Sequence, residues 1–545
     1  MAGVRVDAIL RGRFVTFDEA RPEANTIATL GGRIVALDGD TEGLSARVEE
    51  DFGERPVFPG FHDAHCHTTS FGLGLDAIDL SSPPISSLED LYAAVANSAA
   101  SRNPGDWIVG TGYDQNKLGG SHPDRRRLDT AAGGRPVWLQ HTSGHMCMIN
   151  SAALAVIGPA AVAAPIAGGV VVTDGAGEPT GLLQERAQSL VQQIVLPRSL
   201  DELATAIGRA HDRYLAEGLT SACDAGIAGG WIGQSPLELA AYQLARERGA
   251  LKVRTTVMIA SDLVHDVRAH PHDGVAAALD AGLRTGLGDE WLRIGSLKVF
   301  SDGSLIGRTC WMHDAFSDDA GNTGYPQAAP GELRNLIVNA HSAGWQVATH
   351  AIGDAAVAFT LDCYEEALRA HPRADHRHRI EHCGITSDTS LRRIRELGVI
   401  PVPQGRFVGE IGDGMLAALG AGRVQQAYRL ASFLRNGVVL PGSSDRPVVD
   451  GRPLLGIADM CVRRTESGQP FAPLEALSPQ EALFAYTKGS AFAVRAEHER
   501  GSLAVGQLAD LVVLGEDPRR LPAEEIAGVP VLATVVGGEV AYRAG

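Results

Sequence analysis

The side chains best suited to chemistry in this sequence stand where short apolar runs end. Six of them can bind a metal ion or move a proton, and in chain order they are His65, His67, Lys298, His350, His382 and Asp445. Imidazole and carboxylate groups are common ligands of zinc and of similar divalent ions. Their occurrence at the ends of successive runs predicts that they converge on one metal site.

Each of these residues alone is weak evidence for such a site. The chain contains 18 histidines, and a single histidine is more often a surface residue or a hydrogen-bonded core residue. A lone Asp445 is typical of a turn or helix cap, and a lone Lys298 of an interior ion pair. The pair His65 and His67 is stronger evidence, because alternate residues of a strand share a face while Cys66 points away. The prediction depends on the whole set.

Eight apolar runs position these residues. In chain order they are VFPGFHDAHCH, LTSACDAG, VRTTVMI, LRIGSLKVFSDG, WQVATHAIGD, RIEHCGI, VIPVPQ and VVLPGSSD. Amphipathic segments such as DTSLRRIRELG lie between most of them. Buried strands that alternate with helices are typical of a parallel α/β barrel, whose active site forms at the C-terminal ends of the strands. The sequence therefore predicts a (β/α)8, TIM-like barrel over residues 58–498, with a helix after each run.

Two further units are expected around this barrel. The first connection is too long for one crossover, so it predicts an inserted subdomain over about 70–217, in which DWIVGTGYD and RPVWLQHTSGH read as strands. There SLEDLYAAVANSAAS reads as a helix and residues 159–169 as a loop. Residues 1–57 and 499–545 both carry short alternating runs between turn residues. Because chain ends often lie close together, we expect them to form one composite β-sandwich domain.

Composition limits the partners and the compartment. The net charge of −17 argues against nucleic acid, because a phosphate-binding surface needs clustered lysine and arginine. Seven cysteines without a CxxC pair and the lack of a secretion signal predict a reducing compartment, hence the cytoplasm. No apolar window is long enough to span a membrane. The expected partner is a small-molecule substrate, with no nucleic acid and no membrane.

Several segments resemble the amidohydrolase superfamily, namely PGFHDAHCH, KVFSDGSL, THAIGDAA, RIEHCG, GSSDRPV, EALFAYTKGSA and GSLAVGQLADLVVL. More narrowly, KVFSDGS and GHMCMINSAAL are similar to amidohydrolase family 3, which includes N-substituted formamide deformylase. The resemblance covers nearly the whole chain. It implies a barrel enzyme that hydrolyses a carbon–nitrogen bond with a metal-activated hydroxide, and barrels of this superfamily are frequently homodimers.

The resemblance also implies a binuclear metal centre, with two zinc ions expected and manganese or iron as alternatives. The ligands implied for the more buried ion are His65, His67 and Asp445, and those for the second ion are His350 and His382. Lys298 would be carboxylated and bridge the two ions. An unmodified lysine, with a pKa of about 10.4, would repel a divalent ion, and its alternative role is an ion pair with Asp302 or Asp445.

The same resemblance suggests roles around the metals. Asp445 would accept a proton from water and then deliver it to the leaving nitrogen, as general base and general acid. Candidate substrate contacts are His145, Arg308, Arg379 and Gln404. Asp302 and Asp354, beside the ligands, would accept hydrogen bonds from imidazoles. The family often has a proline directly after the glutamine that corresponds to Gln404. Here Gly405 stands at that position, so the shape of the loop after the seventh run is not predicted.

Three alternatives remain. A deaminase of the superfamily usually has a glutamate three residues after the fifth-strand histidine, whereas Asp354 occupies this region after His350. An ester, lactone or phosphoester hydrolase could use the same metals. A non-catalytic metal-binding barrel protein would retain the ligands without hydrolysing any substrate, and a metal analysis combined with an amide screen separates these functions.

Overall fold

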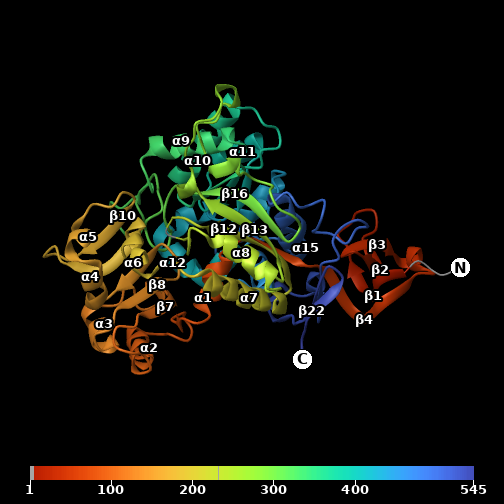
Figure 1. Cartoon of the computed structure of the whole chain (residues 1–545), viewed down its shortest axis with the longest axis horizontal. Coiled ribbons are helices and arrows are strands. Elements are labelled where there is room, and N and C mark those ends of the chain that lie inside the picture. Colours follow the sequence, from red (N-terminus) through yellow and green to blue (C-terminus); the bar gives the residue numbers. More distant parts are fainter. Residues whose placement is uncertain (1–4, 231) are drawn as a thin grey trace.

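The computed structural model describes residues 5–230 and 232–545. Three large sheets organise the chain (Figure 1): a central parallel sheet, the sheet of the insertion, and a sheet made from both ends of the chain. In Figure 1 the sheet of the insertion and the terminal sheet lie on opposite sides of the central sheet. Among the described helices, none is both long and apolar enough to cross a membrane.

The central sheet forms a nearly closed barrel of seven parallel strands. In spatial order they are β5 (Phe61–Cys66), β12 (Leu219–Ile227), β13 (Arg254–Ala260), β16 (Leu292–Phe300), β17 (Val347–Ala351), β18 (Arg379–His382) and β19 (Ile400–Val402). The strands are buried along nearly their whole length, which explains why the runs are almost continuously apolar. The predicted parallel barrel is thus confirmed at the level of its fold.

The eighth predicted run, residues 438–445, is not a regular strand. It nevertheless runs parallel to β5, because Ala64 N donates to Gly442 O (3.0 Å) and Asp445 N donates to His65 O (2.7 Å). Pro441 has no N–H to donate, and the N–H of Gly442 turns to the carbonyl of Ala485 (2.8 Å) instead of a neighbouring strand. The segment therefore fills the gap between β5 and β19 without completing the ladder.

Helices connect most of the barrel strands. They are α7 (Leu200–Ala216), α8 (Glu238–Glu247), α9 (Pro330–Ser342), α10 (Asp354–Ala370), α11 (Asp388–Leu397) and α12 (Arg406–Arg423). The predicted helix after the third run is wrong, because residues 261–291 form only 3-10 turns and a ribbon of β14 (His265–Asp266) and β15 (Ala277–Ala278). Pro271 and the positive φ angles of Gly274, Gly282 and Gly286 explain this, since such residues interrupt helices.

The insertion has its own six-stranded sheet. In spatial order its strands are β10 (Gly169–Thr173), β11 (Pro179–Glu185), β9 (Met146–Ile149), β8 (Val137–His141), β7 (Ile108–Tyr113) and β6 (Ile78–Asp79). Strands β7 and β8 and helix α2 (Leu88–Ala100) confirm the three elements predicted within this region. The predicted loop is wrong over its first residues, because Pro159 begins the short helix α5 (Pro159–Ala163), a position that tolerates a missing N–H.

The terminal sheet joins strands from both ends of the chain. Its order is β22 (Glu539–Arg543), β21 (Val531–Val536), β20 (Leu511–Leu514), β4 (Ser45–Pro59), β1 (Arg5–Val15), β2 (Glu23–Leu30) and β3 (Arg33–Leu37). Strand β20 pairs antiparallel with β4, with Val513 opposite Val57. A buried ion pair ties this sheet to the barrel, since Nε of Arg254 on β13 lies 2.6 Å from Oδ2 of Asp510. The two chain ends thus lie in one sheet beside the barrel.

Candidate metal centre

Two histidines at the end of β5 face an aspartate from the eighth segment. Oδ1 of Asp445 lies 3.2 Å from Nε2 of His65 and 3.1 Å from Nε2 of His67, and the ligand atoms of the three residues all lie within 4.8 Å of one another. Cys66 points away, and its thiol donates to the carbonyl of Cys223 (3.5 Å). The two-residue period of the strand therefore brings both imidazoles to one side.

This group fits a divalent cation. Its donor set is two imidazole nitrogens and a carboxylate oxygen, which is the chemistry that zinc prefers. Nε2 of His65 is buried and has no hydrogen-bond partner among the described residues, and such an atom needs an explanation. Burial alone would raise the pKa of Asp445, but the imidazoles of His65, His67 and His382 outweigh burial and hold it well below its usual range. Asp445 is therefore an ionised carboxylate, the form that a metal ion could bind.

A buried carboxylate and arginine fix the ring of His65 from behind. Nδ1 of His65 donates to Glu381, and Arg379 binds both oxygens of Glu381 (2.7 and 2.9 Å) and the carbonyl of Ala64 (2.8 Å). Burial acts to raise the pKa of Glu381, but Arg379 and His65 hold it far below its usual value. A carboxylate on the second nitrogen sets the tautomer of a metal-binding histidine and raises its basicity. The structure thus presents Nε2 of His65 to the centre.

His350 and His382 lie beside this group. The ring centroid of His382 lies 5.0 Å from that of His65 and 4.5 Å from that of His350. Nδ1 of His382 donates to Oε1 of Gln404 (2.8 Å), and Nε2 of His350 donates to the carbonyl of Gly303 (3.1 Å). Each imidazole therefore has one nitrogen bound to protein and a second one for another ligand.

Lys298 is buried in the barrel close to the same residues. Burial lowers the pKa of its ammonium to about 8, although the carboxylates of Glu381 and Asp445 act in the opposite direction. Its Nζ lies 4.9 Å from the centroid of the Phe300 ring. Burial makes this amine expensive to keep charged, so it gives up its proton at a lower pH than an exposed lysine, although the nearby carboxylates still favour the ammonium.

Three residues at the candidate metal centre have a strained backbone conformation. His382 and Asp445 have positive φ angles of 66° and 61°, and Cys383 has one of 45°. Residues other than glycine rarely adopt this conformation, and they tend to do so at functional sites, where the surrounding structure imposes it. Here Asp63 imposes it in part, because it accepts hydrogen bonds from the N–H groups of His65 and Ser444 (both 3.1 Å). The loop that carries Asp445 is thereby fastened to β5.

Of the predicted substrate contacts, three lie outside the cavity wall. Gln404 orients His382, as described, and Arg379 lies behind His65. Arg308 forms an ion pair with Asp318 and donates to the carbonyl of Ile306 (2.6 Å). All three have protein partners in this structure, and their predicted contact with substrate stays a prediction.

The two aspartates predicted to orient imidazoles bind mainly backbone. Asp302 accepts hydrogen bonds from the N–H groups of Gly353 (2.8 Å) and Trp311 (3.0 Å), and its Oδ1 lies 3.5 Å from Nε2 of His350. Burial raises the pKa of Asp302 to about 7. Asp354 accepts from the N–H of His313 (2.9 Å). Both therefore hold the loops that follow β16 and β17.

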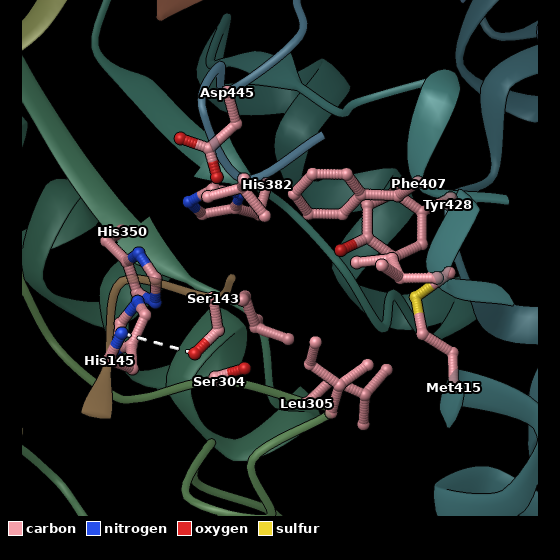
Figure 2. Close-up of a pocket in the computed structure, with 14 residues that line it drawn as sticks. Ser143, His145, Ser304, Leu305, His350, His382, Phe407, Met415, Tyr428 and Asp445 are labelled. Carbon is pink, nitrogen blue, oxygen red and sulfur yellow. Dashed lines mark hydrogen bonds between the residues drawn. The ribbon is translucent and has the colours of Figure 1, made fainter. Parts of the chain in front are cut away.

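A cavity opens onto the centre. Figure 2 shows Asp445, His382, His350 and His145 along one side of it and Phe407, Tyr428 and Met415 on the other. The polar residues of the lining are Ser143, His145, Ser304, His350, His382 and Asp445, and the others are Leu305, Ile306, Ile352, Phe407, Ile411, Met415, Tyr428 and Val448. No lysine or arginine is among these described lining residues. The cavity thus has one polar wall and one apolar wall.

A sequence profile described as the amidohydrolase family matches residues 49–542. The chain belongs to the amidohydrolase family. It is therefore a hydrolase, and the resemblance seen in its motifs is confirmed.

Relatives of this amidohydrolase match over nearly its whole length. Protein LONG AFTER FAR-RED 3 of Arabidopsis thaliana is 31% identical, with 99% of this chain and 92% of the relative covered. N-substituted formamide deformylase of Arthrobacter pascens is 29% identical, with 100% and 99% covered. A crystal structure of an uncharacterized metal-dependent hydrolase from Pyrococcus furiosus is 26% identical, with 94% and 100% covered and a TM-score of 0.69.

The amidohydrolase chain contains positioning residues that the sequence alone did not reveal. Asp63 shares a strand face with His65 and His67, so the two-residue period was a usable signal for it. Glu381 precedes the ligand candidate His382, but its contact with His65 joins β18 to β5. That contact spans 316 positions of the sequence, and no local pattern encodes it.

Proposed function

We propose that this amidohydrolase is a metal-dependent enzyme that cleaves the carbon–nitrogen bond of an amide, with N-substituted formamides as the first class to test. The observation that carries the proposal is the group of His65, His67 and Asp445, whose ligand atoms lie within 4.8 Å of one another at the mouth of the barrel. The names of the relatives from Pyrococcus furiosus and Arthrobacter pascens support metal dependence and the amide class respectively.

Two ions have candidate ligands in this chain. His65, His67 and Asp445 would hold one divalent ion, and His350 and His382 would contribute to a second. Lys298, carboxylated, would bridge them, and the burial of its amine supports a modified form. A divalent ion held here would lower the pKa of water and polarise the scissile carbonyl. Zinc suits the imidazole-rich donors best, and manganese and iron are the alternatives.

Asp445 is the group we propose to move the proton. Its Oδ1 faces both imidazoles of β5, so Oδ2 is the oxygen that would accept a proton from water and later deliver it to the leaving nitrogen. Glu381 and Gln404 keep the rings of His65 and His382 in place during this cycle. The apolar wall of the cavity limits the access of bulk water to the reacting atoms.

The lining of the cavity limits the substrate. Phosphate and carboxylate groups are commonly bound by arginine or lysine, and neither is present among the described residues that line the cavity. Phe407, Ile411 and Met415 on α12 offer an apolar surface instead. We therefore propose an uncharged amide with an apolar substituent, which the polar wall contacts through His145.

Metal removal and an amide screen test this function. The full chain, stripped of metal by a chelator, should hydrolyse N-butylformamide at no more than the background rate, and added zinc should restore turnover. An Asp445→Asn variant should lose at least about 1,000-fold in kcat, because it cannot carry the proton or the charge. Metal-loaded protein that leaves formamides, N-acyl amines and esters all intact would refute the proposal and favour a binding protein.

We also propose a domain organisation, a compartment and an oligomeric state for this chain. Residues 1–57 with 499–545 would form a composite β-sandwich domain, and residues 58–498 the barrel domain, with the inserted subdomain over about 70–217. The protein would work in the cytoplasm as a homodimer on a small-molecule substrate, without nucleic acid or membrane. Light scattering of the purified full chain gives its mass and checks the dimer.

A further inference from the structure

The insertion brings a buried histidine–glutamate pair to the polar wall of the cavity. Nδ1 of His145, in the turn after β8, lies 2.7 Å from Oε2 of Glu185, the last residue of β11. The ring centroid of His145 lies 4.9 Å from that of His350, and Figure 2 shows the two rings next to each other at the cavity. Glu185 is fully buried. The pair thus reaches the metal centre from outside the barrel.

Glu185 is held firmly in place. Its Oε1 accepts a hydrogen bond from the Thr309 hydroxyl (2.5 Å), and its N–H donates to the carbonyl of His145 (2.7 Å). A Cβ atom at Gly303 would lie 2.3 Å from Oε1, so only glycine fits there. Glu185 itself has a φ of 52°, which is strained for a residue with a side chain. The barrel loop that follows β16 and the insertion therefore meet at this carboxylate.

The contact with Glu185 fixes the orientation of the His145 ring. A carboxylate is only an acceptor, so Nδ1 must carry the proton. This holds for the neutral ring and for the imidazolium alike, and in both forms Nε2 is on the side of the ring away from Glu185. An amide group presents a carbonyl oxygen and an N–H side by side, so Nε2 can donate to the first or accept from the second.

We propose that His145 hydrogen-bonds the scissile amide through Nε2 and that Glu185 is the positioning residue for His145. This inference rests on the proposed amide hydrolysis. It orients the substrate, because the amide then lies at the polar wall beside His350 while its substituent lies against Phe407 and Met415. The insertion is thereby part of the reaction site and supplies a contact that the barrel strands lack.

A double-mutant cycle on the zinc-loaded full chain tests this coupling. With N-butylformamide, His145→Ala should lower kcat about 100-fold, which is typical of losing one preorganised hydrogen bond to the reacting group. Glu185→Ala should lower kcat by about 10- to 100-fold, as for other partners that orient a catalytic imidazole. The double variant should be no slower than His145→Ala. Losses that multiply in the double variant would overturn the inference.

Matched variants separate positioning from folding and from metal binding. Glu185→Gln keeps an acceptor for Nδ1–H and should retain kcat within about fivefold of the wild type. Glu178→Ala, on the exposed turn before β11, is the control and should change nothing. Zinc content should stay at the wild-type value in His145→Ala. A loss of zinc from this variant would make His145 a ligand, and a rise in KM without a change in kcat would contradict its role at the reacting amide.

A proton spectrum tests the pair without turnover. Imidazole N–H groups bound to buried carboxylates resonate far downfield, and such groups among the described residues include those of His145–Glu185 and His65–Glu381. One downfield resonance should vanish in both His145→Ala and Glu185→Ala while the other remains. A spectrum unchanged by Glu185→Ala would overturn the pairing. Failure of the wild type on every amide would overturn the proposed function and this inference together.

Discussion

At the scale of single residues, three imidazoles at the candidate metal site are each oriented by a side-chain acceptor. Glu381 accepts from His65, Gln404 from His382 and Glu185 from His145. These partners decide which nitrogen faces the cavity. The arrangement of the candidate ligands therefore depends on the acceptors behind them. The neutral Gln404 offers the cleanest variant because its removal leaves no charge unpaired.

Gln404→Ala should weaken zinc binding by about 10- to 100-fold, because the ring of His382 loses the acceptor that fixes its orientation. Competition with a chelator of known affinity measures this change in the full chain. Gln425→Ala, at an exposed position after α12, is the control. An unchanged zinc affinity together with a lowered unfolding temperature would show that Gln404 is only structural.

Sequence reasoning reached the candidate ligands but not their partners. His65 and His67 could be predicted to share a direction because a strand has a period of two, and the structure brings both to Asp445. Glu185 and Thr309 meet across 124 positions, so only the fold determines their contact. Arg308 shows the same limit, since its ion pair with Asp318 could not be read from the sequence.

At the scale of elements, a row of neutral histidines lies between the helices and strands at the end of the barrel away from the cavity. The N–H of Val347 donates to Nδ1 of His378 (3.0 Å), so Nε2–H of His378 donates to Nδ1 of His341 (2.8 Å). Nε2–H of His341 then donates to the carbonyl of His371 (2.7 Å). Protonation of Nδ1 of His378 or of Nδ1 of His341 would remove a hydrogen-bond acceptor and break this row of hydrogen bonds.

Acid should therefore destabilise the protein through His378. Burial, with His376, His341 and Arg373 next in effect, keeps the pKa of His378 well below its ordinary value of 6.5. The unfolded chain then binds a proton that the folded chain does not, and stability falls as the pH drops below 6.5, by about 1.4 kcal/mol per pH unit for this residue. Above pH 6.5 both states are neutral and the residue contributes no pH dependence.

Chemical denaturation at pH 7.5 and pH 5.5 measures this effect. His378→Gln should reduce the loss of stability between the two values, whereas replacement of the exposed His272 by Gln should not. Equal pH dependence in the His378→Gln variant and the wild type would contradict the argument.

The elements themselves were predictable to different degrees. Helix α11 carries a complete signature, since Ser387 caps its first turn and Gly398 ends it in the left-handed conformation. The spacing of Phe407, Ile411 and Met415 indicates a helix with an apolar face, but spacing cannot reveal that this face lines the cavity. The prediction of a strand at 438–445 was wrong. The segment is apolar, but Pro441 has no N–H with which to pair to a neighbouring strand.

At the scale of the whole molecule, the buried pair of Arg254 and Asp510 joins the barrel to the terminal sheet. Asp510 also accepts from the N–H of Gly537 (2.8 Å), and the guanidinium of Arg254 lies over the ring of Trp291 (4.5 Å). The two charges are almost completely shielded from solvent. Water cannot reach either charge to stabilise it. Removal of one side chain therefore leaves the other as an uncompensated buried charge.

Asp510→Ala should lower the free energy of unfolding by about 3 to 5 kcal/mol, the usual result of breaking a buried pair. Glu49→Ala breaks the exposed pair with Arg11 in the same sheet and should cost less than about 1 kcal/mol. Calorimetry on the metal-free chain measures both. Equal effects of the two substitutions would show that Asp510 does not link the two units.

The position of β20 between β4 and β21 also governs how the chain is made. Strand β4 is complete at Pro59, yet the neighbour that covers its edge begins only at Leu511. At about 5 to 20 residues per second, a ribosome leaves that edge without its native partner for roughly 25 to 90 s. An uncovered edge invites pairing with other chains, so nascent copies of this enzyme should depend on chaperones until their last strands emerge.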